Sequence, residues 1–158
     1  MSDRGARAGW VRWVVAGLMV VVVLVVDQVV KSLVREHITF DETISIVPGV
    51  DIVHTINRGI AFSLFPGHPR IVATVTAVAL CLIAVALVRF GRRSTAVLIG
   101  GGMLVGGAIG NLIDRLRHDG VTDFIAVTSH WPPFNVADIG IVCGAILAAI
   151  GLMGERAD

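Results

Sequence analysis

Four long apolar segments constrain this chain more than any other feature. Uncharged runs cover 13–26, 71–88, 94–113 and 139–154. A bilayer core about 30 Å thick needs about 20 residues of helix, so the second and third runs suffice with little extension. The first run reaches that length only with Asp27 through Leu33, and the fourth only with Val136 through Asp138. We therefore predict a single α-helical membrane domain over residues 1–158, with four transmembrane helices at about 11–33, 70–88, 94–115 and 136–154.

The composition excludes several other classes of protein. Hydrophobic residues make up 55% of the 158 residues and charged residues only 16%, and a chain this short cannot hide so much apolar surface from water. The net charge is +1 and the chain has two cysteines, which argues against a nucleic-acid partner and against a disulfide scaffold. Membrane lipid is therefore the expected surrounding of much of the chain.

Clusters of basic residues predict how the helices are oriented. Arg4, Arg7 and Arg12 precede the first apolar run, and a basic turn at 89–93 joins the second and third. With four spans, these segments and both termini share one side, which the positive-inside rule makes cytoplasmic. No small-residue cleavage site follows the first apolar run, so we predict an uncleaved helix there. The segments at about 34–69 and 116–135 are then extracytoplasmic.

The two extracytoplasmic segments differ in pattern. Apolar and polar residues alternate at 43–47 and 51–56, which is typical of half-buried strands, so we expect a small β-sheet on the membrane surface between the first and second helices. The segment 116–135 is polar, and we predict a short helical loop there, with Trp131 at the level of the lipid headgroups. His54, His118 and His130 are interpreted as surface residues.

Acidic residues next to apolar spans are costly in lipid and therefore call for a reason. Four such residues, Asp27, Asp114, Asp123 and Asp138, fall toward the extracytoplasmic face in this topology. Asn111 lies three residues before Asp114 and four before Arg115, so these three share one helical face. Several separate segments thus deliver polar groups to one membrane depth.

The sequence favours some catalytic chemistries over others. It has no His-Glu-x-x-His, no paired cysteine motif and no Gly-x-Ser-x-Gly, so a metal site and a serine elbow have little support, and we expect no metal or cofactor. A dyad of Lys31 with Ser63 or Ser32 is conceivable, but Lys31 follows Asp27 by four residues, which favours a helical ion pair. A pair of aspartates that share one proton is the chemistry that survives.

Five motifs then occur in order along the chain. They are Asp27-Gln28-x-x-Lys31, Asn57-x-Gly59-x-Ala61-Phe62, Gly110-Asn111-x-x-Asp114-Arg115, Val121-x-Asp123-Phe124 and Phe134-Asn135-x-Ala137-Asp138. Together they resemble the signature of the lipoprotein signal peptidases, also called signal peptidase II. The resemblance runs from residue 27 to residue 138, which is most of the chain.

The resemblance implies a fold and an activity. Members are bacterial aspartyl endopeptidases of the cytoplasmic (inner) membrane, with four spans, a β-cradle on the membrane surface and an active site at the extracytoplasmic face. They remove the signal peptide from a prolipoprotein that carries a diacylglyceryl group, cutting just before the lipidated cysteine. Inhibition by globomycin-type cyclic peptides is also implied.

The resemblance also assigns roles to residues. It implies that Asp123 and Asp138 are catalytic. Substrate binding falls to the positions that match the family's polar motif residues and to a neighbouring glycine turn, namely Asn57, Gly59, Asn111, Arg115 and Asn135. Asp27, Lys31 and Asp114 are expected to support the site.

Two further expectations come from the residues themselves. Asp138 lies near the start of the fourth helix, where the helix dipole favours a carboxylate, so we predict that Asp138 carries more of the negative charge and Asp123 is more often protonated. The alternative functions are a small proton-coupled transporter or channel that uses intramembrane carboxylates, and an assembly subunit without chemistry. Transporters usually keep such groups near the midplane within repeated halves, which this chain lacks.

Overall fold

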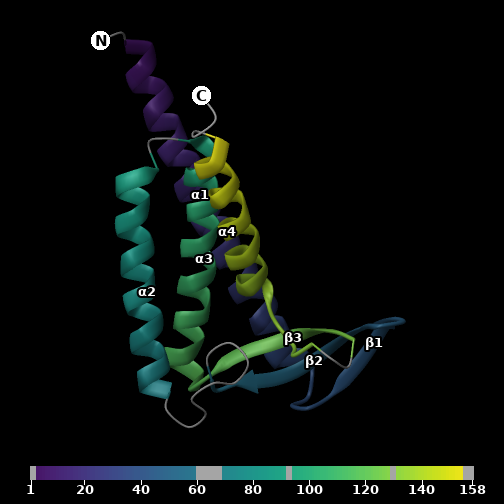
Figure 1. The fold of residues 1–158 in the computed structure, drawn as a ribbon. Helices are drawn as coiled ribbons and strands as arrows, with labels where there is room; N and C mark the ends of the chain where they lie inside the picture. The colour runs from purple at the N-terminus through teal and green to yellow at the C-terminus, as the bar shows by residue number, and fades with distance from the viewer. Residues whose placement is uncertain (1–2, 60–68, 92–93, 129–130, 155–158) are drawn as a thin grey trace.

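The computed structural model describes residues 3–59, 69–91, 94–128 and 131–154. It contains four helices and three strands, in the order α1 (Asp3–His37), β1 (Thr43–Val47), β2 (Val50–Asn57), α2 (Pro69–Phe90), α3 (Thr95–His118), β3 (Val121–Val127) and α4 (Val136–Gly154). All four helices are long and apolar enough to cross a membrane, which confirms the predicted helical membrane fold. The start of α1, the end of α2 and the end of α4 lie at one end of the bundle, and the sheet lies at the other (Figure 1).

Helix α3 is the centre of the bundle. It packs against α4, α1 and α2, and it is the most buried of the four spans. Its glycines allow this close approach, because a Cβ on Gly100 would lie 2.5 Å from the carbonyl oxygen of Gly144, and one on Gly106 would lie 2.7 Å from that of Val20. These glycines of α3 therefore serve helix packing, as small residues in membrane helices commonly do.

The sheet has the order β1-β2-β3 and is antiparallel throughout. The strands predicted around 43–47 and 51–56 are confirmed, but β1 is exposed along its whole length rather than half-buried. The short helical loop predicted within 116–135 is wrong, because Val121–Val127 forms the third strand. β-branched and aromatic residues dominate this segment, and the free edge of β2 gives it a partner, so Thr55 pairs with Asp123 and Asn57 with Val121. A strand from between α3 and α4 thus completes a sheet that begins between α1 and α2.

One histidine is also placed differently from the prediction. His54 is buried in β2, where its Nδ1 lies 2.7 Å from the carbonyl oxygen of Ile38. The adjacent residues Val53 and His54 are both buried, where the register of β2 against β3 shifts between Ile52 and Thr55, and the ring of His54 faces the loop after α1. His118 is exposed, as predicted, and His130 lies outside the described residues.

Candidate active site

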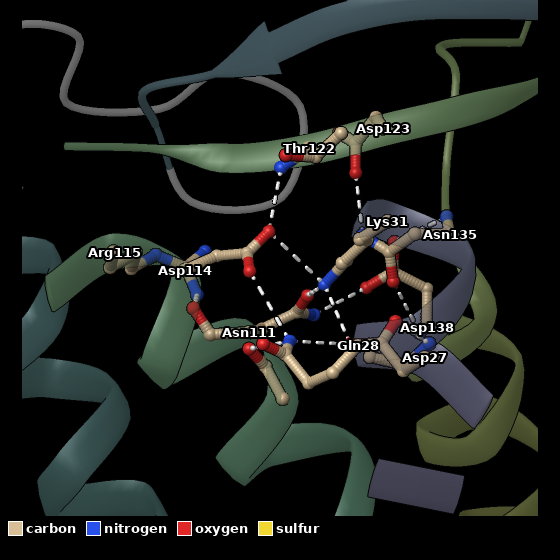
Figure 2. A network of polar contacts seen from close by, with 12 residues as sticks. Asp27, Gln28, Lys31, Asn111, Asp114, Arg115, Thr122, Asp123, Asn135 and Asp138 are labelled. Atoms are coloured by element: carbon tan, nitrogen blue, oxygen red, sulfur yellow. Dashed lines mark hydrogen bonds and ion pairs between the residues drawn. The ribbon is translucent and has the colours of Figure 1, made fainter. Parts of the chain in front are cut away.

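Asn135, which directly precedes α4, connects the two predicted catalytic aspartates. The side-chain Oδ1 of Asn135 accepts the backbone N–H of Asp138 at 3.0 Å, and Asp138 Oδ2 accepts the backbone N–H of Asn135 at 3.2 Å. This reciprocal arrangement is a helix capping box. Asn135 also donates from Nδ2 to Asp123 Oδ1 at 2.6 Å. One buried asparagine therefore binds both carboxylic residues, as Figure 2 shows.

Backbone hydrogen bonds fix the strand of Asp123 against the start of α4. The N–H groups of Phe124 and Ile125 both donate to the carbonyl oxygen of Phe134, at 3.0 and 2.8 Å, and the N–H of Phe134 donates back to Ile125. These bonds join the residue after Asp123 to the residue before Asn135. The two aspartates are consequently held by main chain as well as by side chains.

Asn111 on α3 contacts the second aspartate. Its Nδ2 donates to Asp138 Oδ1 at 2.9 Å, and its Oδ1 accepts from Lys31 Nζ at 2.9 Å. Both oxygens of Asp138 therefore accept a hydrogen bond, one from Asn111 and one from the backbone of Asn135. Donors to both oxygens favour the ionised form of a carboxylate.

Asp27, Lys31 and Asp114 form a fully buried group that we call the ion cluster. Lys31 Nζ lies 2.9 Å from Asp27 Oδ2 and 3.4 Å from Asp114 Oδ2, which confirms the predicted ion pair between Asp27 and Lys31. Gln28 and Arg35 of α1 also reach Asp114, and Arg35 donates to the hydroxyl of Thr122 at 2.9 Å. Of the serines considered as partners of Lys31, Ser32 is exposed and Ser63 lies outside the described residues.

Arg115, Asn57 and Gly59 lie together beside the aspartates. Arg115 donates to the carbonyl oxygens of Asn111 and Gly59, at 3.3 and 3.4 Å, and the N–H of Gly59 donates to Asn57 Oδ1 at 3.0 Å. The Nε of Arg115 is buried, and within the described part of the chain no hydrogen-bond partner reaches it. A buried donor of this kind is costly unless an acceptor arrives.

A cavity of about 460 Å³ opens beside these groups. Its polar wall contains Asn57, Asn111, Arg115, Asp123 and Asp138. Its apolar wall comes from α2, α3 and α4 and includes Val75, Ala79, Ile83, Leu104, Ile141 and Val142. The cavity thus brings together an apolar surface and both aspartates, and it joins all the predicted substrate-binding residues except Gly59 and Asn135.

Burial changes the protonation of Asp123, which is 3% exposed and belongs to the sheet outside the helical spans. Burial, and after it the neighbouring charge of Asp138, raise the pKa of Asp123 from 3.8 to about 7. Hydrogen bonds from Asn135 and Asn57 and the charge of Lys31 act in the opposite direction. At neutral pH a large share of Asp123 is therefore protonated. That Asp138 carries more of the negative charge than Asp123 stays a prediction.

Several residues of the site escaped the sequence reasoning. Gln28 and Arg35 reach Asp114 from α1, and the backbone N–H groups of Thr122 and Ala137 bind carboxylates of the ion cluster. Gln28 adjoins Asp27 in the first motif, which is a usable signal, whereas a backbone donor leaves no mark in a sequence. In the described ranges, no group of three or more His, Cys, Asp and Glu residues is arranged to hold a metal ion.

These features define a class: a multi-pass membrane protein in which two carboxylic side chains meet at the end of a helix bundle, beside a largely apolar cavity. The signal peptidase II family model matches residues 19–153. The chain belongs to the signal peptidase II family. It is a hydrolase of lipoprotein processing, a multi-pass bacterial membrane peptidase that removes signal peptides from lipoproteins.

Relatives and solved structures agree with this assignment. The lipoprotein signal peptidase of Maridesulfovibrio salexigens is 38% identical over 154 residues, which cover 92% of this chain and 99% of that protein. The one from Halothermothrix orenii is 36% identical, over 88% of this chain and 95% of that protein. A solved bacterial membrane enzyme is 28% identical and superposes with a TM-score of 0.76. The match covers 89% of this chain and 88% of the chain of that enzyme.

Proposed function

We propose that this protein is an aspartic endopeptidase in which Asp123 and Asp138 together activate water. The observation that carries the proposal is their shared partner: Asn135 binds both residues, and both line the same cavity. Two neighbouring carboxyl groups with one proton between them provide a base and an acid at once. The substrate is a diacylglyceryl-modified prolipoprotein, cut immediately before the lipidated cysteine.

The environments of the two aspartates favour different roles. Asp138 accepts two hydrogen bonds and lies in the first turn of α4, where the positive end of the helix dipole favours an anion. Asp123 is almost completely buried, and its pKa of about 7 leaves much of it protonated at neutral pH. Asp138 is therefore the base that takes a proton from water, and Asp123 is the acid that donates a hydrogen bond to the scissile carbonyl.

The reaction then follows from these roles. Water attacks the carbonyl carbon while its proton passes to Asp138, and the carbonyl oxygen takes a proton from Asp123, giving a neutral tetrahedral intermediate. Collapse of this intermediate breaks the carbon–nitrogen bond: the proton on Asp138 goes to the leaving amine, and one diol hydroxyl gives its proton back to Asp123 as the carbonyl of the new carboxylic acid forms. The dyad ends in its starting state, so that no cofactor is needed.

The remaining polar groups suit substrate binding. Arg115 Nε is a buried donor that a substrate carbonyl can satisfy, and Asn57, Asn111, Asn135 and Gly59 surround the same region. The apolar wall between α2 and α4 suits the apolar segment of a signal peptide and its lipid. We propose further that the site works at the extracytoplasmic face of the cytoplasmic (inner) membrane, that both termini are cytoplasmic, and that globomycin-type peptides inhibit it there.

The test is cleavage by the purified protein in detergent. The parent should convert a diacylglyceryl-modified precursor to the shorter product, and it should leave the same precursor without lipid uncut. Asp123→Asn and Asp138→Asn should each abolish cleavage, whereas Asp41→Asn, which removes an exposed carboxylate before β1, should not. Cleavage that persists in either dyad variant would refute the mechanism, and a parent that does not cut the lipid-modified precursor would refute the proposed substrate.

A further inference from the structure

Each carboxylate of the ion cluster binds the backbone directly before one of the two dyad aspartates. Asp27 Oδ1 accepts the N–H of Ala137 at 2.8 Å, and Ala137 precedes Asp138. Asp114 Oδ2 accepts the N–H of Thr122 at 3.0 Å, and Thr122 precedes Asp123. The same kind of contact therefore fixes the chain at both dyad positions, although the two carboxylates come from different helices.

Lys31 joins these two contacts into one unit. An ammonium group has three N–H donors and no acceptor. Lys31 Nζ lies 2.9 Å from Asp27 Oδ2, 3.4 Å from Asp114 Oδ2 and 2.9 Å from Asn111 Oδ1, so that three acceptors surround three donors. The side chain of Lys31 is fully buried, and Figure 2 shows it between α1 and α3 at the centre of the network.

The third contact of Lys31 decides which way the Asn111 amide faces. A lysine donates only, so it requires the carbonyl oxygen of Asn111 rather than its NH₂ group. With Oδ1 turned to Lys31, the NH₂ group is left to face Asp138, to which it donates at 2.9 Å. In the opposite orientation, Asn111 would present its oxygen to the Asp138 carboxylate, and the two acceptors would repel each other.

The ion cluster does not line the cavity, so apart from its charge it acts on the dyad through other groups. Of the described residues that line the cavity, none is Asp27, Lys31 or Asp114. A buried ion cluster is also a weak means of packing helices, because apolar side chains of similar volume commonly pack at least as well. Its bonds to Ala137, Thr122 and Asn111 are the contacts that apolar residues could not make.

We propose that Lys31 is a positioning residue of the peptidase reaction: it orients Asn111 toward Asp138 and, through Asp27 and Asp114, fixes the backbone that carries both dyad aspartates. The proposal rests on the aspartic dyad proposed above. It predicts that loss of Lys31 lowers kcat more than substrate affinity, since among the described cavity-lining residues Lys31 binds only Asn111. Misplacing reacting groups by about 1 Å can cost about a hundredfold in rate.

The test compares three purified variants in detergent with the lipid-modified precursor. Lys31→Met removes the cation and its donors. Lys31→Met combined with Asp27→Asn removes one cation and one anion, keeps a carbonyl oxygen for the N–H of Ala137, and leaves Asp114 near Arg35, whose NH1 is 3.6 Å away. Arg12→Met removes an exposed cation from the same helix and is the matched control. The fraction of folded protein is measured for each variant by size exclusion and thermal unfolding.

The expected result is a kcat about a hundredfold lower in Lys31→Met and at least about tenfold lower in the double variant, with KM within about threefold of the parent. The alkaline limb of the pH profile should also move upward. Asp123 faces charges of Asp138 from α4, Lys31 from α1 and Arg115 from α3, and of these Lys31 lowers its pKa. Arg12→Met should match the parent in kcat and in pH profile.

Other outcomes would overturn the proposal. A folded Lys31→Met protein with parental kcat and an unmoved pH profile would make the ion cluster a packing element only. Loss of folded protein in both Lys31 variants would assign the cluster to folding rather than to positioning. These results differ from failure of the dyad itself, which the parent and the Asp123→Asn and Asp138→Asn variants report independently.

Discussion

Replacing Asp123 with asparagine should stabilise the folded protein above pH 7 while it abolishes cleavage. The parent must bury Asp123 next to Asp138, and this is why its pKa is about 7 rather than 3.8. Asparagine has the same shape and no charge, and its carbonyl oxygen can still accept the 2.6 Å hydrogen bond from Asn135. The variant therefore loses the unfavourable buried charge and keeps the local contact.

The sign of the pH dependence follows from the direction of the shift. Between pH 4 and pH 7 the folded protein binds a proton at Asp123 that the unfolded chain has already released, so stability falls as the pH rises through this window. Below pH 4 Asp123 is protonated in both the folded and the unfolded protein, so it causes no loss of stability. Above pH 7 it is ionised in both, and the full loss of stability is present. The raised pKa changes the protonation equilibrium of Asp123 by about three powers of ten. This corresponds to a change of at most about 4 kcal/mol in the free energy of unfolding.

The assay is thermal unfolding in detergent, followed by tryptophan fluorescence from pH 4 to pH 9. At pH 4 the parent and Asp123→Asn should have similar melting temperatures, and by pH 8 the variant should melt several degrees higher. The control variant Asp41→Asn removes an exposed carboxylate and should follow the parent throughout. If the melting temperatures of the parent and Asp123→Asn changed with pH in parallel, this would refute the buried, partly protonated state of Asp123, whatever the activity of the variant.

Three further predictions concern activity and packing. The rate of cleavage by the parent should fall as pH rises through about 7, because Asp123 must be protonated to act as the acid; a profile that is flat from pH 6 to pH 9 would contradict this role. Arg115→Gln should lower kcat/KM by about tenfold to a hundredfold through loss of donors to the substrate, and an unchanged value would remove Arg115 from the binding site. Gly144→Ala should lower the melting temperature, because its Cβ would lie 2.5 Å from the carbonyl oxygen of Gly100, whereas Gly17→Ala, with nothing within 4 Å, should leave it unchanged or raise it slightly.

The parts of the fold that depend on local pattern could be predicted from the sequence. Hydropathy located the four helices, and an imperfect alternation of apolar and polar residues located β1 and β2. Strand β3 was missed because its first four residues are all buried, so Val121–Val127 does not alternate, and because its partner β2 lies far away in the chain. Pairing with a distant edge is a tertiary contact that no local pattern carries.

In the site, too, contacts within one helix could be predicted from the sequence, and contacts between distant segments could not. The ion pair of Asp27 and Lys31 could be predicted because four residues make one helical turn. The bond from Ala137 to Asp27 joins residues 110 positions apart and uses a backbone donor, so spacing could not suggest it. The choice of Asp123 and Asp138 over Asp114 came from the family resemblance, and the structure gives a physical reason for it: Asp114 is occupied by donors on every side, whereas the other two line the cavity.

The small sheet has a chemical role in addition to any role in holding the substrate. Asp123 owes its raised pKa first to burial, and that burial depends on the pairing of β3 with β2 and on the backbone bonds between β3 and Phe134. If the sheet were opened, water would reach Asp123, its pKa would return toward 3.8, and the dyad would lose its acid at neutral pH. The closed sheet is therefore part of what keeps Asp123 protonated at neutral pH.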